Sequence, residues 1–88
     1  MISLEDTKEM MVSQDYRERF VAEYIQLYVR SAKLGQMLNN WKRLDFTPKC
    51  PKYLLETQYK LMQSYLSILV ERADREKIKL PEVKEFFL

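Results

Sequence analysis

The stretch YRERFVAEYIQLYVRSAKLGQMLNNW, residues 16–41, decides the fold of this chain. A mostly apolar row recurs in it in alternating steps of four and three, which is the heptad spacing of one face of an α-helix. The row comprises Phe20, Tyr24, Leu27, Ser31, Leu34, Leu38 and Trp41. A second row of apolar or small residues lies beside it, at Val21, Ile25, Tyr28, Ala32 and Gly35. Because one partner helix covers only one such row, we expect this helix to need two neighbours, and we infer that the second comes from another copy of the protein.

The segments before and after this stretch predict a hairpin. Residues 1–12 fit a short amphipathic helix capped by Ser3, which either covers the hairpin or docks on a neighbouring subunit. Ser13 is the expected N-cap of a long helix over residues 14–44. Residues 45–51 form the turn, because Pro48 and Pro51 both oppose helix continuation. We expect Phe46 to fill the closed end of the hairpin.

Residues 52–79 predict a second long helix with two apolar rows of its own. One row is Leu55, Tyr59, Met62, Leu66, Leu69 and Ala73, and the other is Leu54, Gln58, Leu61, Tyr65, Ile68 and Arg72. The tail, residues 80–88, contains Phe86 and Phe87, which fit a hook onto another subunit. The sequence therefore predicts an all-α antiparallel hairpin, one domain over residues 1–88, which assembles into a helical homo-oligomer.

Composition excludes several functional classes. The chain has 88 residues, a single Gly, no His and one cysteine, Cys50, so neither an intrachain disulfide nor a zinc site is expected. Fifteen basic side chains nearly balance 13 acidic ones, and the cations at Arg17, Arg19, Lys42, Arg43, Lys49 and Lys52 are too dispersed along the chain to predict DNA binding. The absence of a basic leader and of a long apolar run predicts a cytoplasmic protein that does not cross a membrane.

Catalysis is not expected from this inventory. There is no His, Cys50 lies in the turn, and the carboxylates are scattered along helix faces, so we expect neither an enzyme nor a cofactor or metal. Gly35, the single Gly, favours close approach of two helices over a ligand contact.

A few polar residues on the apolar rows are candidates for binding a ligand. Arg72 and Ser31 interrupt otherwise apolar rows, with Lys33 close to Ser31, so each must be paired or must face a cavity. Arg72 is either paired with Glu23, Asp15 or a symmetry mate, or it awaits a phosphate or carboxylate. Tyr16 begins the long helix beside Arg17 and Arg19, so an aromatic face and two guanidinium groups lie near the free N–H groups of a helix start, which favour an anion.

The chain resembles the small phage hairpin proteins related to the anti-CBASS and anti-Thoeris nucleotide sponges. The resemblance covers roughly residues 14–78 and rests on four groups of residues. They are Tyr16-Arg17-Glu18-Arg19-Phe20-x-x-Glu23-Tyr24, Leu27-x-x-Arg30-x-x-Lys33-Leu34, Asp45-Phe46-Thr47-Pro48, and Leu54-Leu55-x-x-Gln58 with Met62-x-x-Tyr65-x-x-x-Leu69-x-x-Arg72.

The resemblance implies a function. Members of that family assemble, commonly as hexamers, and sequester cyclic di- or trinucleotide immune signals at subunit interfaces without cleaving them. Tyr16 looks like the base-stacking tyrosine and Arg72 like the interface arginine that reaches phosphate, and Lys33 falls where a polar or basic contact is expected. Ser31 departs from the lysine expected in a dinucleotide pocket. The implied protein acts in the cytoplasm of an infected bacterium.

A second hypothesis needs no ligand. The same two-sided helices would also serve as an oligomerisation module, or would bind and inhibit a host protein. Titration with cyclic nucleotides separates the two hypotheses.

Overall fold

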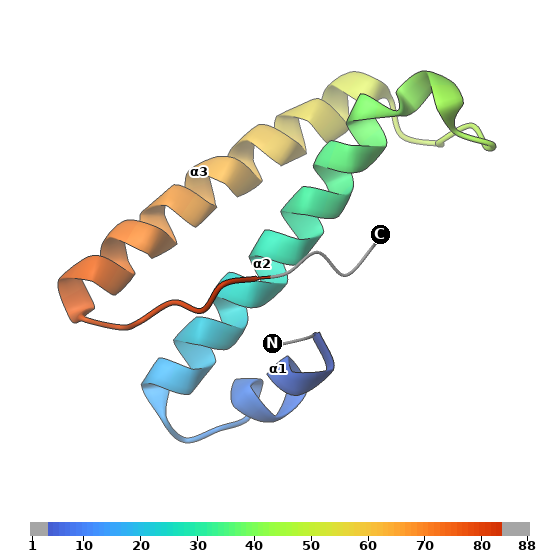
Figure 1. Cartoon of the computed structure of the whole chain (residues 1–88). Helices are drawn as coiled ribbons and strands as arrows, with labels where there is room; N and C mark the ends of the chain where they lie inside the picture. The colour runs from blue at the N-terminus through green and yellow to red at the C-terminus, as the bar shows by residue number, and fades with distance from the viewer. Residues whose placement is uncertain (1–3, 84–88) are drawn as a thin grey trace.

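Residues 4–83 are described by the computed structural model, and they form three α-helices with one short 3-10 turn. The elements are α1 (Leu4–Met11), α2 (Tyr16–Asn39), η1 (Trp41–Arg43) and α3 (Lys52–Glu76). α2 and α3 run antiparallel and are joined at one end, and α1 lies against α2 (Figure 1). No strand occurs within residues 4–83, so the predicted all-α hairpin is confirmed. The predicted cap Ser3 and the tail residues Phe86 and Phe87 lie outside the described residues.

The second neighbour of α2 belongs to the same chain. Ala22, Ile25 and Val29 are buried, and Gln26 on the same side of the helix donates a hydrogen bond of 3.2 Å to Thr7 Oγ1 of α1. Thr7 itself is fully buried. α1 therefore covers the side of α2 that contains Ile25, whereas Tyr28 of the same predicted row stays 38% exposed, and the inference that another copy covers this row stays a prediction.

The two rows of α3 have different environments. Every residue of the row from Leu55 to Ala73 is buried or half-buried, and Leu69 and Ala73 share a core cluster with Phe20. Every residue of the row from Leu54 to Arg72 is exposed. Ile68, for example, keeps 56% of its surface exposed. The hairpin thus uses one face of α3 and leaves a second apolar row uncovered.

The chain beyond α3 fills the open end of the hairpin. Lys77 adopts a left-handed conformation with φ 56°, which ends α3 three residues earlier than the predicted residue 79. The turn lets the Ile78 backbone N–H donate to the Ala73 carbonyl at 2.8 Å. Ile78 and Leu80 then pack into the Phe20 cluster, so apolar burial accounts for the early stop.

α2 is also shorter than the predicted helix over residues 14–44. Its N-cap is Asp15, whose Oδ1 accepts a hydrogen bond from Arg17 N at 2.9 Å. Ser13, the predicted cap, instead accepts from Asp15 N. At the other end the Gln36 carbonyl accepts hydrogen bonds from both the backbone N–H and the side-chain amide of Asn40, the residue at which α2 ends.

Phe46 does not fill the closed end of the hairpin. It is 56% exposed, and the prediction that it packs there is wrong. The indole of Trp41 instead lies under the ammonium group of Lys52, 5.9 Å from the ring centroid. At the closed end, a cation–π contact between Lys52 and Trp41 is therefore found in place of the predicted packing of Phe46.

Close helix approach at Gly35 yields a testable prediction. A Cβ added at Gly35 would lie 2.8 Å from Cε1 of Tyr59, so the ring must move. We expect Gly35→Ala to lower the melting temperature, although alanine has the higher helix propensity by about 1 kcal/mol. In a Tyr59→Ala background the same change should raise the melting temperature, because only the propensity term remains. Thermal unfolding of the four proteins in this cycle is the measurement, and an equal effect in both backgrounds would contradict the contact.

Candidate functional site

Two residues singled out in the sequence, Tyr16 and Arg72, meet at the open end of the hairpin. Arg72 Nη2 donates to the Tyr16 hydroxyl at 2.7 Å. The same hydroxyl donates to Glu76 Oε1 at 2.8 Å, and Arg72 Nε donates to Glu76 Oε2 at 3.2 Å. The guanidinium carbon of Arg72 also lies 5.0 Å from the centroid of the Phe20 ring. The start of α2 and the end of α3 thus position a tyrosine, an arginine and a carboxylate together.

The partner of Arg72 is Glu76, one helical turn away, and not the Glu23 or Asp15 expected from the sequence. The two side chains keep 45% and 36% of their surface exposed. The guanidinium is therefore not the buried group that its place on an apolar row predicted. An exposed pair of this kind contributes about 0–1 kcal/mol, so a stronger anion can replace the carboxylate.

The hydrogen bond to Glu76 is the main reason that the pKa of Tyr16 is raised above its usual value of 10.0. Desolvation raises this pKa further, and the charge of Arg72 opposes both effects. Glu76 likewise raises the pKa of Arg72, which stays charged throughout. At neutral pH the cluster therefore presents a neutral phenol, a cation and a carboxylate.

The other predicted ligand residues lie elsewhere. Arg17 faces a separate cavity beside Lys77 and Lys79, at the junction of α2 with the chain beyond α3. Ser31 is fully buried and accepts a hydrogen bond from Gln63 Nε2 of α3. A ligand reaches Ser31 only if α3 moves away. Lys33 is exposed on α2.

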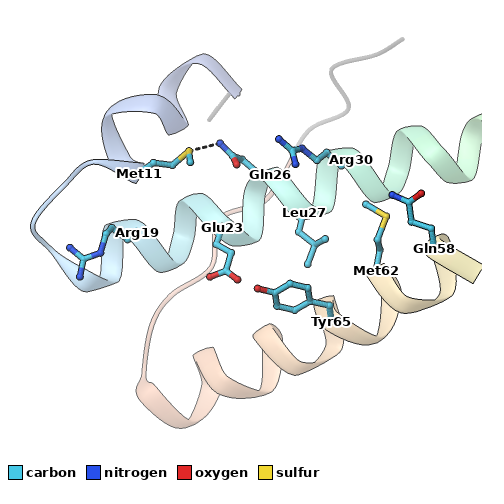
Figure 2. A pocket seen from close by; sticks show the side chains of 9 residues that line it. All are labelled: Met11, Arg19, Glu23, Gln26, Leu27, Arg30, Gln58, Met62 and Tyr65. Carbon is cyan, nitrogen blue, oxygen red and sulfur yellow. Dashed lines mark hydrogen bonds between the residues drawn. The ribbon is translucent and has the colours of Figure 1, made fainter.

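A groove of about 380 Å³ lies where the three helices meet, and it is the largest of the cavities described here. Its lining residues come from α1, α2 and α3 (Figure 2). They are Met11, Arg19, Glu23, Gln26, Leu27, Arg30, Gln58, Met62 and Tyr65. Figure 2 shows the carboxylate of Glu23 and the hydroxyl of Tyr65 directed toward the same space between α2 and α3.

The groove combines an apolar base with polar groups of the kinds that bind nucleotides. Leu27 and Met62 supply apolar surface, and Tyr65 supplies an aromatic ring that is 43% exposed. Arg19 and Arg30 outnumber the single carboxylate, Glu23, among the lining residues. Its volume is at the lower end of the range of about 300–1,000 Å³ found for small-molecule sites. One nucleotide unit, with its base against Tyr65 and its phosphate near an arginine, matches this chemistry.

One local contact ties the groove to α1. Gln26 Nε2 donates to the sulfur of Met11 at 2.6 Å, as drawn in Figure 2. Arg19 Nη1 donates to the Ser13 carbonyl at 2.7 Å and so holds the α1–α2 connection. Two residues that line the groove, Gln26 and Arg19, therefore also hold α1 and the α1–α2 connection in place.

Reasoning from the sequence did not identify the groove as a site, although a signal was present. Seven of its nine lining residues belong to the residue groups that carry the family resemblance, and only Met11 and Gln26 do not. Gln58, Met62 and Tyr65 are spaced by four and three on α3, so they share one face. What the sequence did not show is that Arg19, Glu23 and Arg30 of α2 lie opposite that face.

Neither a metal-binding cluster nor a membrane-spanning helix occurs among the described residues. Within residues 4–83 no cluster of three or more acidic, His or Cys side chains is arranged to hold a metal ion. No helix in this part of the chain is long and apolar enough to span a membrane.

The sequence model of the Sequestin family matches residues 14–75. The chain belongs to the Sequestin family. The matched residues include Tyr16, Arg72 and eight of the nine residues that line the groove, whereas Met11 and Glu76 lie outside the match. The family name indicates that Sequestin proteins sequester a ligand, which is a binding role and not a catalytic one. Searches of curated proteins and of solved structures found no match.

The Tyr16 cluster predicts a measurable titration. In Glu76→Ala the pKa of Tyr16 should fall, because the acceptor is lost while the charge of Arg72 remains. In the wild type the raised pKa stabilises the fold below about pH 10, and this contribution is lost as the pH rises through the pKa of folded Tyr16. NMR of the tyrosine Cζ carbons, with Tyr16→Phe to assign the signal, measures both effects. Glu71→Ala is a matched control, and an unchanged Tyr16 pKa in Glu76→Ala would show that the hydrogen bond is absent in solution.

Proposed function

We propose that the protein is a sponge that binds cyclic di- or trinucleotides and sequesters them without cleaving them. The observation that carries the proposal is the groove, whose lining includes Tyr65, two arginines and the apolar side chains of Leu27 and Met62. Membership of the Sequestin family supports sequestration as the role. The resemblance to phage sponges supports cyclic nucleotides as the ligand and the cytoplasm of an infected bacterium as the place. In this proposal the protein opposes CBASS-type or Thoeris-type defence.

The Tyr16 cluster supplies the second half of the proposed site. Arg72 and Tyr65 are seven residues apart on the exposed row of α3, so both face the same direction. In the proposal Tyr16 stacks on a base and Arg72 binds a phosphate after that phosphate replaces Glu76. Arg17, which lines a separate cavity, and Lys33, which is exposed farther along α2, remain predicted ligand residues that the structure does not bring to this cluster. A Ser31 contact would need α3 to move.

A second copy of the chain would complete this site. Gln58 and Tyr65 line the groove and also belong to the exposed row of α3, which contains Leu54, Leu61 and Ile68. A copy packed on this row would cover the groove and the Tyr16 cluster together, which would remove the ligand from water. The proposal therefore includes a homo-oligomer, with a hexamer as the form that the resemblance implies.

The exposed row of α3 also favours a second candidate function. Leu61 is 66% exposed and Ile68 is 56% exposed, and such a row can bind a partner protein without any small ligand. In that case the protein is an oligomerisation or interaction module, and it acts by occupying a host protein. Ligand binding separates this candidate from the sponge.

A thermal-shift panel of cyclic di- and trinucleotides tests the sponge. A true ligand at a hundredfold excess over Kd stabilises the folded state by about 2.7 kcal/mol, which gives a clear rise in melting temperature. The ligand should be recovered intact by mass spectrometry. Tyr65→Ala, Arg30→Ala and Arg72→Ala should each reduce the shift. Arg75→Ala, which removes an exposed arginine paired with Glu71, should not.

One combination of results would contradict the sponge. If no cyclic nucleotide raises the melting temperature of the wild type, while Arg72→Ala lowers that of the free protein, Arg72 is a structural partner of Glu76. The interaction module then replaces the sponge.

The oligomer has a test of its own. The wild type should show a mass in light scattering well above the 10.7 kDa of one chain. Ile68→Asp places a charge on the exposed row and should give monomers that keep their helical circular dichroism, because Ile68 is not part of the hairpin core. Ser67→Asp is the control, since Ser67 is exposed but lies on a face of α3 that points away from the exposed row. A wild type that is monomeric at micromolar concentration would contradict the assembly.

A further inference from the structure

A second cavity, of about 360 Å³, lies at the closed end of the hairpin, where α2 ends and α3 begins. This end is the one at which α2, η1 and the start of α3 meet in Figure 1. Seven residues line the cavity: Leu38, Asn39, Asn40, Trp41, Lys42, Arg43 and Lys52. None of them lines the groove or belongs to the Tyr16 cluster, so this cavity is separate from the site of the proposed function.

The cavity is cationic. Lys42, Arg43 and Lys52 are three of the six cations that appeared dispersed in the sequence, and the fold brings them around one space. No lining residue is acidic. Within residues 4–83 no ion pair joins any of these three side chains to a carboxylate, although Asp45 and Glu56 are close in sequence. The three charges are therefore available to an anion.

An aromatic ring stands beside these charges. Lys52 Nζ lies over the Trp41 ring at 5.9 Å from its centroid, within the range of a cation–π contact. A phosphate held by Lys52 would thus lie next to the indole. The first turn of α3 carries no acidic residue, and Pro51 provides no side-chain cap, so the positive end of this helix is not neutralised. The cation cluster and the positive end of α3 both attract an anion, and the indole offers a flat surface beside it.

We propose that this cavity binds a nucleoside phosphate. Lys42, Arg43 and Lys52 hold the phosphate, and the base packs against the indole of Trp41. Asn39 offers an amide to the base edge, whereas the amide of Asn40 is already engaged with the Gln36 carbonyl. The ligand is either a free mononucleotide or the terminal nucleotide of a single strand, because both present the same phosphate and base.

Trp41 provides a local signal for the test, since it is the single Trp in the protein. Titration of the wild type with AMP should change its fluorescence in a saturable manner, and the affinity should fall as salt is raised. Inorganic phosphate should bind more weakly, and adenosine should give no saturable change. Lys52→Ala and Arg43→Ala should each weaken AMP binding by about tenfold or more. Lys49→Ala is the matched control, because Lys49 is an exposed cation of the same connection but does not line the cavity.

Several results would overturn the proposal. They are the absence of a saturable response to AMP, an equal response in Lys52→Ala and Arg43→Ala, or equal affinity for AMP and inorganic phosphate. A 5′-phosphorylated oligonucleotide that binds more tightly than AMP assigns the ligand to strand ends, and the reverse order assigns it to free nucleotides. Lys52 and Arg43 are exposed, so loss of binding in these variants is not loss of folding. The thermal-shift panel tests the sponge at other residues, so either proposal can fail while the other stands.

Discussion

The structure depends on α2 being covered on two opposite sides by its own chain. On one side Phe20 and Leu27 pack with α3 and with the returning chain, and on the other Ile25 and Val29 are buried where α1 lies. Of the two apolar rows of α2, Tyr28 is the member that stays exposed, at 38%. Among the described residues α3 packs against α2 and against the chain that follows it, and its second row remains in contact with solvent. The uncovered surface of this small protein is thus concentrated on α3 and not, as the sequence first indicated, on α2.

This arrangement places the groove at the junction of all three helices. α1 contributes Met11, which is held by Gln26, and α3 contributes Tyr65 from the edge of its uncovered row. A ligand in the groove would touch all three helices, of which α1 and α3 each pack mainly against α2. Binding would therefore stabilise the position of α1 as well as that of α3, because both lose contacts if the groove opens. Residues 14–75, the part matched by the Sequestin family, contain the α2 and α3 sides of the groove but not the α1 side.

The spacing of apolar residues in the sequence predicts the fold. It does not predict which of several partners of similar energy a side chain contacts. The two rows of α3 were recognised because steps of four and three place residues on one face whatever the tertiary context. Ser13 and Asp15 are both good helix caps, and only the geometry of the α1–α2 connection makes Asp15 the cap. Arg72 was placed on an apolar row, but whether such a row is covered depends on assembly and not on spacing. The cations at the closed end are dispersed when only their separation in sequence is considered. The connection between α2 and α3 brings three of them to one cavity.

The two ends of the hairpin treat anions differently, and this difference constrains what each can bind. At the open end Arg72 already contacts the carboxylate of Glu76. An incoming phosphate must therefore bind Arg72 more strongly than Glu76 does before the exchange is favourable. Ligands with several phosphates and a base to stack on Tyr16 meet this requirement, whereas a single small anion does not. At the closed end no carboxylate lines the cavity, and a phosphate has no competitor within the site. In the two proposals, the internal carboxylate would thus make the open end selective for larger ligands, whereas at the closed end Trp41 and Asn39 would distinguish a nucleotide from simple phosphate.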